Sequence, residues 1–150
     1  MRGMLSLPYL LSDSSRLLRR AFDARVRTLG MTSQQARLLL ILQVNEGENQ
    51  GFYAEVLEVE PISLTRMIDR MEEAGLIERR RDPADRRAWR LFLTDRSRQL
   101  IDQVRDCLTG LEDEMLTGLD EAQRAALAGM LETIRVNFSN VRPIPEVNHG

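Results

Sequence analysis

Residues 61–95, PISLTRMIDRMEEAGLIERRRDPADRRAWRLFLTD, change character partway along their length. The first part spaces its apolar residues as a helix does and closes at Gly75, a residue type that commonly ends helices. The second part holds two short strand-like runs, 76–80 and 89–93, on either side of the turn sequence DPAD. We therefore expect a helix followed directly by a β-hairpin with a basic turn.

A short helix is expected just upstream of this segment. Residues 52–59, FYAEVLEV, have helical spacing, and Pro61 is tolerated in the first turn of the helix that follows. Two helices joined by a tight turn form a helix-turn-helix unit, and the hairpin after it makes the unit a winged helix. The residues of these two helices expected to face a core are Tyr53, Ala54, Leu57, Ile62, Met67 or Ile68, and Met71.

Two more helices are expected on the N-terminal side. Residues 7–29 have helical spacing and end at Gly30, and Thr32 with Gln35 forms a capping box that opens a helix running to about Glu46. The apolar residues of the first of these helices are Leu10, Leu11, Leu17, Leu18, Ala21, Phe22, Val26 and Leu29.

The C-terminal part of the chain also reads as helical. Thr94 caps a long helix that Gly118 breaks, and Asp120 with Gln123 caps a last helix. The apolar stripes of these two helices are Leu100, Ile101, Val104, Leu108, Leu111 and Met115, followed by Leu127, Met130, Leu131, Ile134 and Phe138. Together with the first helix they carry more apolar surface than a monomer needs, so we expect a dimer.

The predicted fold is mainly α-helical with a small β-hairpin wing, in one domain of 150 residues. Residues of about 32–98 are expected to form the winged-helix lobe, about 5–30 and 99–140 dimerisation helices, and 141–150 a loose tail.

The composition points away from several classes of protein. The single cysteine cannot form an internal disulfide, and the N-terminal apolar run is too short to cross a membrane, so a cytoplasmic protein is expected. The single histidine, His149, has no cluster of ligands around it, so we expect no metal site and no cofactor. The chain offers no glycine-rich phosphate loop and no nucleophile with a partner base, so an enzyme is not expected.

Positive charge is concentrated in one place. The chain has a formal net charge of −2, yet residues 79–98 hold eight arginines and only three aspartates. This asymmetry favours a polyanionic partner for one surface, namely nucleic acid. The alternative is a solvated basic face, with Arg70 paired to Glu73 or Asp69 on its own helix.

Each part of a winged helix has a different place on a duplex. A helix fits the major groove, and the residues on or near the outer face of the predicted recognition helix are Ser63, Thr65, Arg66 and Arg70. A hairpin tip fits the minor groove, where Arg86 and Arg87 are expected to insert with Asp85 holding an arginine in shape. The arginines expected to contact phosphates are Arg79, Arg80, Arg81 and Arg90.

The stretch 57–95, LEVEPISLTRMIDRMEEAGLIERRRDPADRRAWRLFLTD, resembles the MarR family of winged-helix bacterial transcription regulators. The resemblance implies a homodimer in which the first and the last two helices of each subunit interlock. It also implies recognition helices in adjacent major grooves of a pseudo-palindromic operator and wings in the flanking minor grooves. By position, the resemblance makes Ser63, Thr65 and Arg66 recognition contacts. It makes Arg87 the wing-tip arginine, supported by Asp85 and Arg86.

Two departures from the family pattern stand in the middle of the chain. Ala36 replaces a large tryptophan found in many relatives, which enlarges the expected cleft between the two lobes. Tyr53 stands where leucine is commoner, and Phe52 where a small or polar residue is commoner. An exposed Phe52 would be unusual, so it either packs or serves a surface that the sequence does not identify.

Small-molecule sensing is the regulatory mode that the resemblance implies, with an effector that is anionic or phenolic. The residues expected to line its cleft are Tyr9, Arg16, Arg19, Arg20, Ala36 and Leu40. The alternative is that these arginines lie on the surface or in the dimer interface. Cys107 lies on an apolar stripe, where a free cysteine is most often a small buried hydrophobe, so thiol sensing is disfavoured.

The sequence therefore predicts a ligand-responsive, sequence-specific repressor that binds operator DNA as a dimer. The rival hypothesis is a winged-helix module that binds protein and uses its wing as a docking surface.

Overall fold

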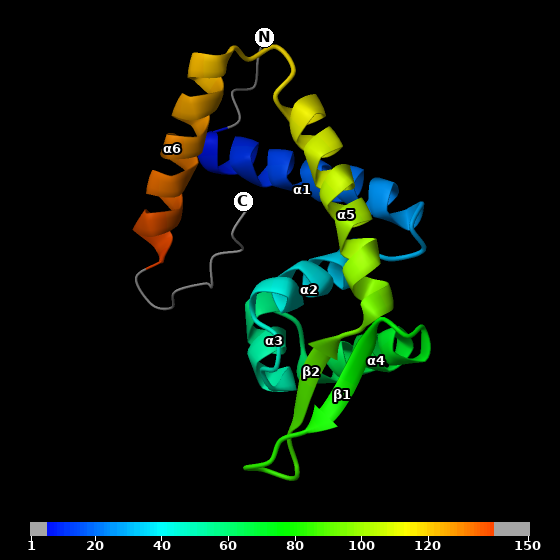
Figure 1. The fold of residues 1–150 in the computed structure, drawn as a ribbon. Coiled ribbons are helices and arrows are strands. Elements are labelled where there is room, and N and C mark those ends of the chain that lie inside the picture. The colour runs from blue at the N-terminus through cyan, green and yellow to red at the C-terminus, as the bar shows by residue number, and fades with distance from the viewer. Residues whose placement is uncertain (1–5, 140–150) are drawn as a thin grey trace.

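The chain forms two connected lobes, as Figure 1 shows for the computed structural model, which describes residues 6–139. A winged-helix lobe contains α2, α3, α4 and the hairpin, whereas α6 lies at the opposite end and α5 runs from the hairpin to it, with α1 packed beside α5. The elements are α1 (Leu7–Arg27), α2 (Ser33–Val44), α3 (Gln50–Leu57), α4 (Pro61–Glu73), β1 (Ile77–Arg81), β2 (Trp89–Leu93), α5 (Asp95–Met115) and α6 (Glu121–Phe138). The predicted fold class is confirmed.

The helix boundaries follow the predicted caps. The Thr32 hydroxyl accepts a hydrogen bond from the Gln35 backbone at 3.2 Å, and the Gln35 side chain accepts one from the Thr32 backbone at 3.0 Å. Asp120 and Gln123 make the same reciprocal pair. These bonds satisfy backbone N–H groups that have no partner inside the first turn of a helix. Gly118, at a φ of 90°, adopts the left-handed conformation that turns the chain between α5 and α6.

The core of the winged-helix lobe is built around α2. Half of the twelve residues of this helix are buried, and the helix packs against α3, β2 and α5 as well as α1. A helix that is apolar on nearly all sides must be enclosed by its neighbours. The buried residues of the lobe with 2% exposure or less include Leu38, Leu39, Ile41, Leu42, Tyr53, Leu57, Leu64, Ile68, Met71, Ile77 and Leu91.

One core prediction is wrong, because Ile62 is 64% exposed and faces away from the lobe. The buried stripe of α4 consists instead of Leu64, Ile68 and Met71, which are four and three residues apart. These residues face α3 and β1, the two elements that α4 packs against. Met67 is half-buried beside them.

The hairpin pairs β1 with β2 in antiparallel register, with Ile77 opposite Leu93 and Arg81 opposite Trp89. A third extended segment, which the sequence did not predict, lies along β2. The backbone of Leu91 bonds to Glu48 at 3.1 Å and to Gly47 at 2.9 Å, next to an isolated bridge between residues 49 and 90. The wing is thus attached to the loop that follows α2.

The buried side chain of Tyr53 holds the loop that follows α2 in place. Its hydroxyl donates to the Asn45 carbonyl and accepts from the Glu48 backbone N–H at 3.1 Å. Burial raises the pKa of Tyr53 to about 12, so the phenol stays protonated at neutral pH. Phe52 packs against the same core and meets the Tyr53 ring edge-on, with centroids 5.2 Å apart. Of the two roles left open for Phe52, the structure shows packing.

The second lobe leaves its apolar side chains uncovered in the single chain. Figure 1 shows α5 and α6 diverging from the turn at 116–120. No residue of α6 is buried, and a groove of about 700 Å³ runs between α1, α5 and α6. The exposed large apolar residues of α1 and α6 are Leu7, Tyr9, Leu10, Leu11, Leu17, Leu18, Met130, Leu131, Ile134, Val136 and Phe138. Among residues 6–139 no helix has the length and apolar character that a membrane crossing requires.

Candidate nucleic-acid interface

The outer face of α4 presents two unpaired arginines. Arg66 and Arg70 lie one helical turn apart and are exposed, and within residues 6–139 neither guanidinium has an ion-pair partner. The alternative pairing of Arg70 with Asp69 or Glu73 is therefore absent from the described residues. Two cations on one ridge can reach an anionic or hydrogen-bonding partner without first breaking an internal contact.

The two hydroxyl residues of α4, Thr65 and Ser63, differ in the internal hydrogen bonds that their side chains make. The hydroxyl of Thr65 donates to the Pro61 carbonyl at 2.9 Å and receives a bond from Gln50 at 3.4 Å. Ser63 is exposed in the first turn. The predicted role of Thr65 thus competes with an internal bond that ties it to its own helix.

Arg79 is predicted to contact phosphate, but its side chain is only 15% exposed in the single chain. Its guanidinium donates to Asp69, to Glu72 at 3.3 Å, to the Gln50 side chain at 3.2 Å and to the Thr65 carbonyl at 3.4 Å. The pleat of β1 turns this residue toward α4 and α3, opposite to its neighbours in the strand. Arg79 is therefore not a free phosphate-binding side chain; it clamps α4 to the wing.

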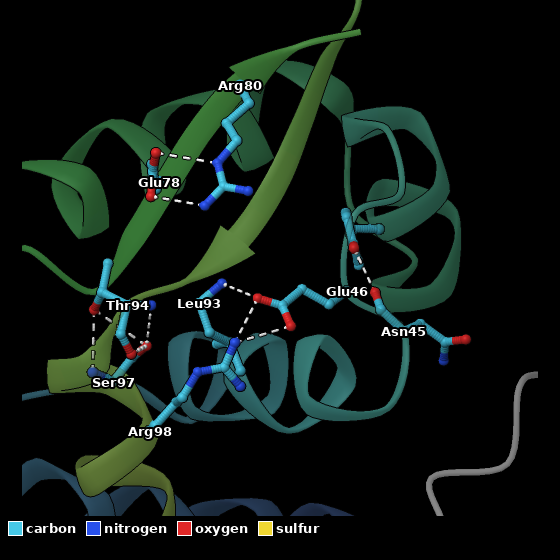
Figure 2. A network of polar contacts seen from close by, with 9 residues as sticks. Asn45, Glu46, Glu78, Arg80, Leu93, Thr94, Ser97 and Arg98 are labelled. Carbon is cyan, nitrogen blue, oxygen red and sulfur yellow. Dashed lines mark hydrogen bonds and ion pairs between the residues drawn. The ribbon is translucent and has the colours of Figure 1, made fainter.

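Arg80 faces the other side of the hairpin. It makes two bonds to Glu78, at 3.1 and 3.2 Å (Figure 2). Its guanidinium also lies 4.0 Å from the centre of the Phe92 ring. The hydrogen bond from Arg80 holds the pKa of Glu78 below its usual value, and the same bond raises the pKa of Arg80. Over half of each side chain is exposed, so the pair can open toward a phosphate.

Arg81 and Arg90 support the wing loop. Arg81 lies 4.7 Å from the Trp89 ring centre and donates to the Arg86 carbonyl at 2.7 Å. Arg90 pairs with Asp82 at 3.2 Å. Both arginines, predicted as phosphate contacts, therefore also shape the loop that carries the wing tip.

The wing tip is held by two aspartates. Asp82 accepts the Ala84 backbone N–H at 2.8 Å, and Asp85 accepts the Arg87 backbone N–H at 3.0 Å. The Ala84 bond, followed by the Arg90 side chain, keeps the pKa of Asp82 below its usual value. Asp85 thus supports Arg87 through its backbone rather than through its guanidinium. The side chain of Arg87 is left exposed.

Arg86 resembles Arg87 in being exposed, and neither guanidinium has a partner within the described part of the chain. The turn thereby projects two cations from its apex, and their charges are not neutralised from inside the protein. This is the arrangement that a narrow, electronegative minor groove favours.

The wing is anchored to α5 by Glu46, a residue that sequence reasoning missed. Its carboxylate accepts the Leu93 backbone N–H at 2.9 Å and pairs with Arg98 of α5 at 2.8 and 3.0 Å (Figure 2). The junction lines a cleft of about 730 Å³, in which Glu46 is bonded to Arg98 and to the Leu93 backbone and Glu78 is bonded to Arg80. It joins α2, β2 and α5, and thus links the wing to the first turn of α5.

The predicted effector residues are only partly brought together. Tyr9, Arg16 and Arg19 line a cavity of about 360 Å³ on α1, together with Ser12 and Asp13. Arg20 is exposed and is not among the residues lining that cavity.

Two other predicted cleft residues are corrected by their burial. Ala36 is fully buried and Leu40 is 6% exposed, because the apolar surface of α2 is consumed by the core. Cys107 is half-buried on α5, with its sulfur 4.0 Å from the Arg25 carbonyl. Within residues 6–139 no three acidic, cysteine or histidine side chains gather as metal ligands, and His149 and the tail lie outside the described residues.

The comparisons with known proteins agree with this geometry. The family model of the MarR family matches residues 31–89. The transcriptional repressor CouR, solved bound to a 23-mer DNA duplex, is 32% identical, with a TM-score of 0.77 over 86% of this chain and 92% of that chain. A MarR transcriptional regulator from Methanosarcina mazei Go1 is 24% identical, with a TM-score of 0.80 over 87% of this chain and 94% of its own.

A third similar structure has the same fold. It is a mutant MarR from E. coli complexed with operator DNA, 23% identical, with a TM-score of 0.76 over 87% of this chain and 94% of that one. Members of this family are transcription regulators and not enzymes. With its winged helix, its flanking helices and these similarities, the chain belongs to the MarR family of DNA-binding transcriptional regulators.

Proposed function

We propose that the protein is a repressor that binds a pseudo-palindromic operator as a homodimer. The observation that carries the proposal is the distribution of free cations. Arg66 and Arg70 on α4, and Arg86 and Arg87 at the wing tip, lack internal partners among residues 6–139, whereas Arg79 and Arg80 of the wing are paired. The free charges thus lie on the two elements whose shapes fit the major and minor grooves.

The roles divide by element. In the major groove, the DNA bases and backbone are contacted by Ser63, Arg66 and Arg70. Thr65 can join them only if its internal hydrogen bond opens. At the wing tip, Arg87 enters the minor groove beside Arg86. Arg80, Arg81 and Arg90 meet phosphates after exchanging part of their internal contacts. The DNA-bound CouR structure, at 32% identity, supports transferring this mode of binding to the present chain.

Homodimer formation follows from the uncovered apolar side chains of α1 and α6. The apolar residues that line the groove between α1, α5 and α6 are Leu18, Leu108, Leu111, Met115 and Leu131, with Arg105, Thr109 and Glu112 of α5 beside them. A contiguous apolar surface of this kind marks an interface in a soluble domain. Residues of about 5–30 and 99–140 would form this interface and residues of about 32–98 the DNA-binding lobe, so that two recognition helices lie about one helical turn of DNA apart.

Selection of bound sequences from a pool of random duplexes tests the proposal. We expect an inverted repeat whose half-sites are centred about 10 base pairs apart, and affinity that falls log-linearly with salt. Arg87→Ala should weaken binding without changing the dimer. Arg37→Ala is the matched control, since Arg37 is also an exposed arginine and lies on α2, outside α4, the wing and the residues assigned to the dimer interface. Salt-independent binding, or no enriched sequence, would favour the rival protein-docking module.

We also propose that a small anionic or phenolic effector controls the operator complex. The cavity on α1 supports this, because Arg19 has no ion-pair partner among residues 6–139 and Arg16 pairs with Asp13 at 2.7 Å. An effector acts only if it binds the DNA-incompetent state more tightly than the competent one. Benzoate should therefore release the duplex from the wild type and not from Arg19→Ala; equal release from both would remove α1 from the proposal.

A further inference from the structure

Ile62 is an apolar side chain on a face where its neighbours are polar. It is the second residue of α4 and 64% exposed, and Ser63 beside it is exposed too. At four-residue spacing, Ile62, Arg66 and Arg70 form one ridge on the face opposite the buried stripe. A lone exposed isoleucine is ordinary on a protein surface. This one, however, occupies the first turn of the recognition helix.

The first turn of a recognition helix is the part that reaches base edges. Of the four bases, only thymine displays a methyl group in the major groove, and apolar side chains are the ones that contact it. The Ile62 side chain has no donor or acceptor, so it cannot bond to the exocyclic amine of cytosine or adenine. Such an amine placed against it would lose water without compensation.

We propose that Ile62 is a specificity-determining residue that reads the C5-methyl group of one thymine in each operator half-site. The inference rests on the proposed function, since it requires α4 to lie in the major groove. Arg66, one turn further along the ridge, supplies donors suited to guanine, so the ridge combines an apolar contact with a cationic one.

Deoxyuridine provides the test, because it differs from thymidine only by lacking that methyl group. Each thymine of the selected operator is replaced in turn, and the affinities of the wild type, Ile62→Val and Ile62→Ala are measured. For the wild type, one position per half-site should lose affinity about fourfold, the value of one buried methyl group. The other thymines serve as the matched control and should lose nothing.

The variants distinguish a direct contact from a general defect. Ile62→Ala should bind the thymine and uracil operators equally, and Ile62→Val should keep part of the difference. Because Ile62 is exposed, both variants should melt with the wild type. A wild type indifferent to uracil at every position, or an Ile62→Ala that remains as sensitive as the wild type, overturns the inference while the proposed function stands. Failure of the wild type to bind any duplex would instead overturn both.

Discussion

Replacing Arg79 by methionine removes the guanidinium that joins β1 to α4 and α3 but keeps a long unbranched side chain. Two ion pairs are lost, to Asp69 and Glu72, which are 54% and 43% exposed. Water screens both pairs, so each contributes about 0.2–1 kcal/mol. The hydrogen bonds to Gln50 and to the Thr65 carbonyl contribute about 0.5–1.5 kcal/mol each. We expect the free energy of unfolding to fall by about 1.5–5 kcal/mol.

The salt dependence of operator binding separates clamping from phosphate contact. A residue that neutralises one phosphate contributes about 0.9 to the slope of log affinity against log salt, hence about 1.8 per dimer. Arg79→Met should leave the slope unchanged while lowering affinity and the urea midpoint. Arg87→Ala should lower the slope with stability intact. If Arg79→Met lowers the slope as Arg87→Ala does and unfolds at the wild-type midpoint, the clamp is refuted.

Three further perturbations probe other parts of the molecule. Leu131→Glu places a charge in the groove between α1, α5 and α6, so the protein should dissociate or unfold. Analytical ultracentrifugation measures this change. A folded monomer with undiminished affinity for a palindrome would contradict the dimer. Tyr53→Phe leaves the Asn45 carbonyl without its buried donor and should lower the free energy of unfolding by about 1–3 kcal/mol in urea titrations, and an unchanged midpoint would argue against the bond. Because the folded pKa of Asp82 is depressed, its contribution to wing order is present above pH 3.8 and is lost as pH falls through the lower folded value. The Ala84 amide resonance should thus shift with a midpoint below 3.8, and a midpoint at or above it would refute the Asx turn.

Most of the helices and both strands could be predicted from residues that are close together in the sequence. Thr32 with Gln35 and Asp120 with Gln123 predict helix starts because capping depends only on residues three apart. The error at Ile62 arose where two stripes compete in one short helix. The ridge that begins at Ile62 continues into Arg66 and Arg70, whereas the buried ridge is apolar throughout. The sequence alone could therefore have shown which of the two ridges is buried.

The contacts of the wing depend on partners distant in sequence, and these the sequence could not supply. Strand alternation places Arg79 and Arg80 on opposite faces, but it does not say which face meets α4. The bonds of Arg79 to Gln50 and of Glu46 to Arg98 span 29 and 52 residues, beyond any local pattern. Ala36 was assigned to a cleft on family grounds, yet the core around α2 leaves no such surface in this chain.

Because no residue of α6 is buried in the single chain, the proposed dimer should be sensitive to protein concentration. In the proposed dimer, α6 is covered only when two subunits meet, so its burial depends on protein concentration. Dilution would then weaken operator binding in two ways. It separates the subunits, and each separated subunit can bind only one half-site. Occupancy of the operator should therefore respond to protein abundance more steeply than simple saturation allows.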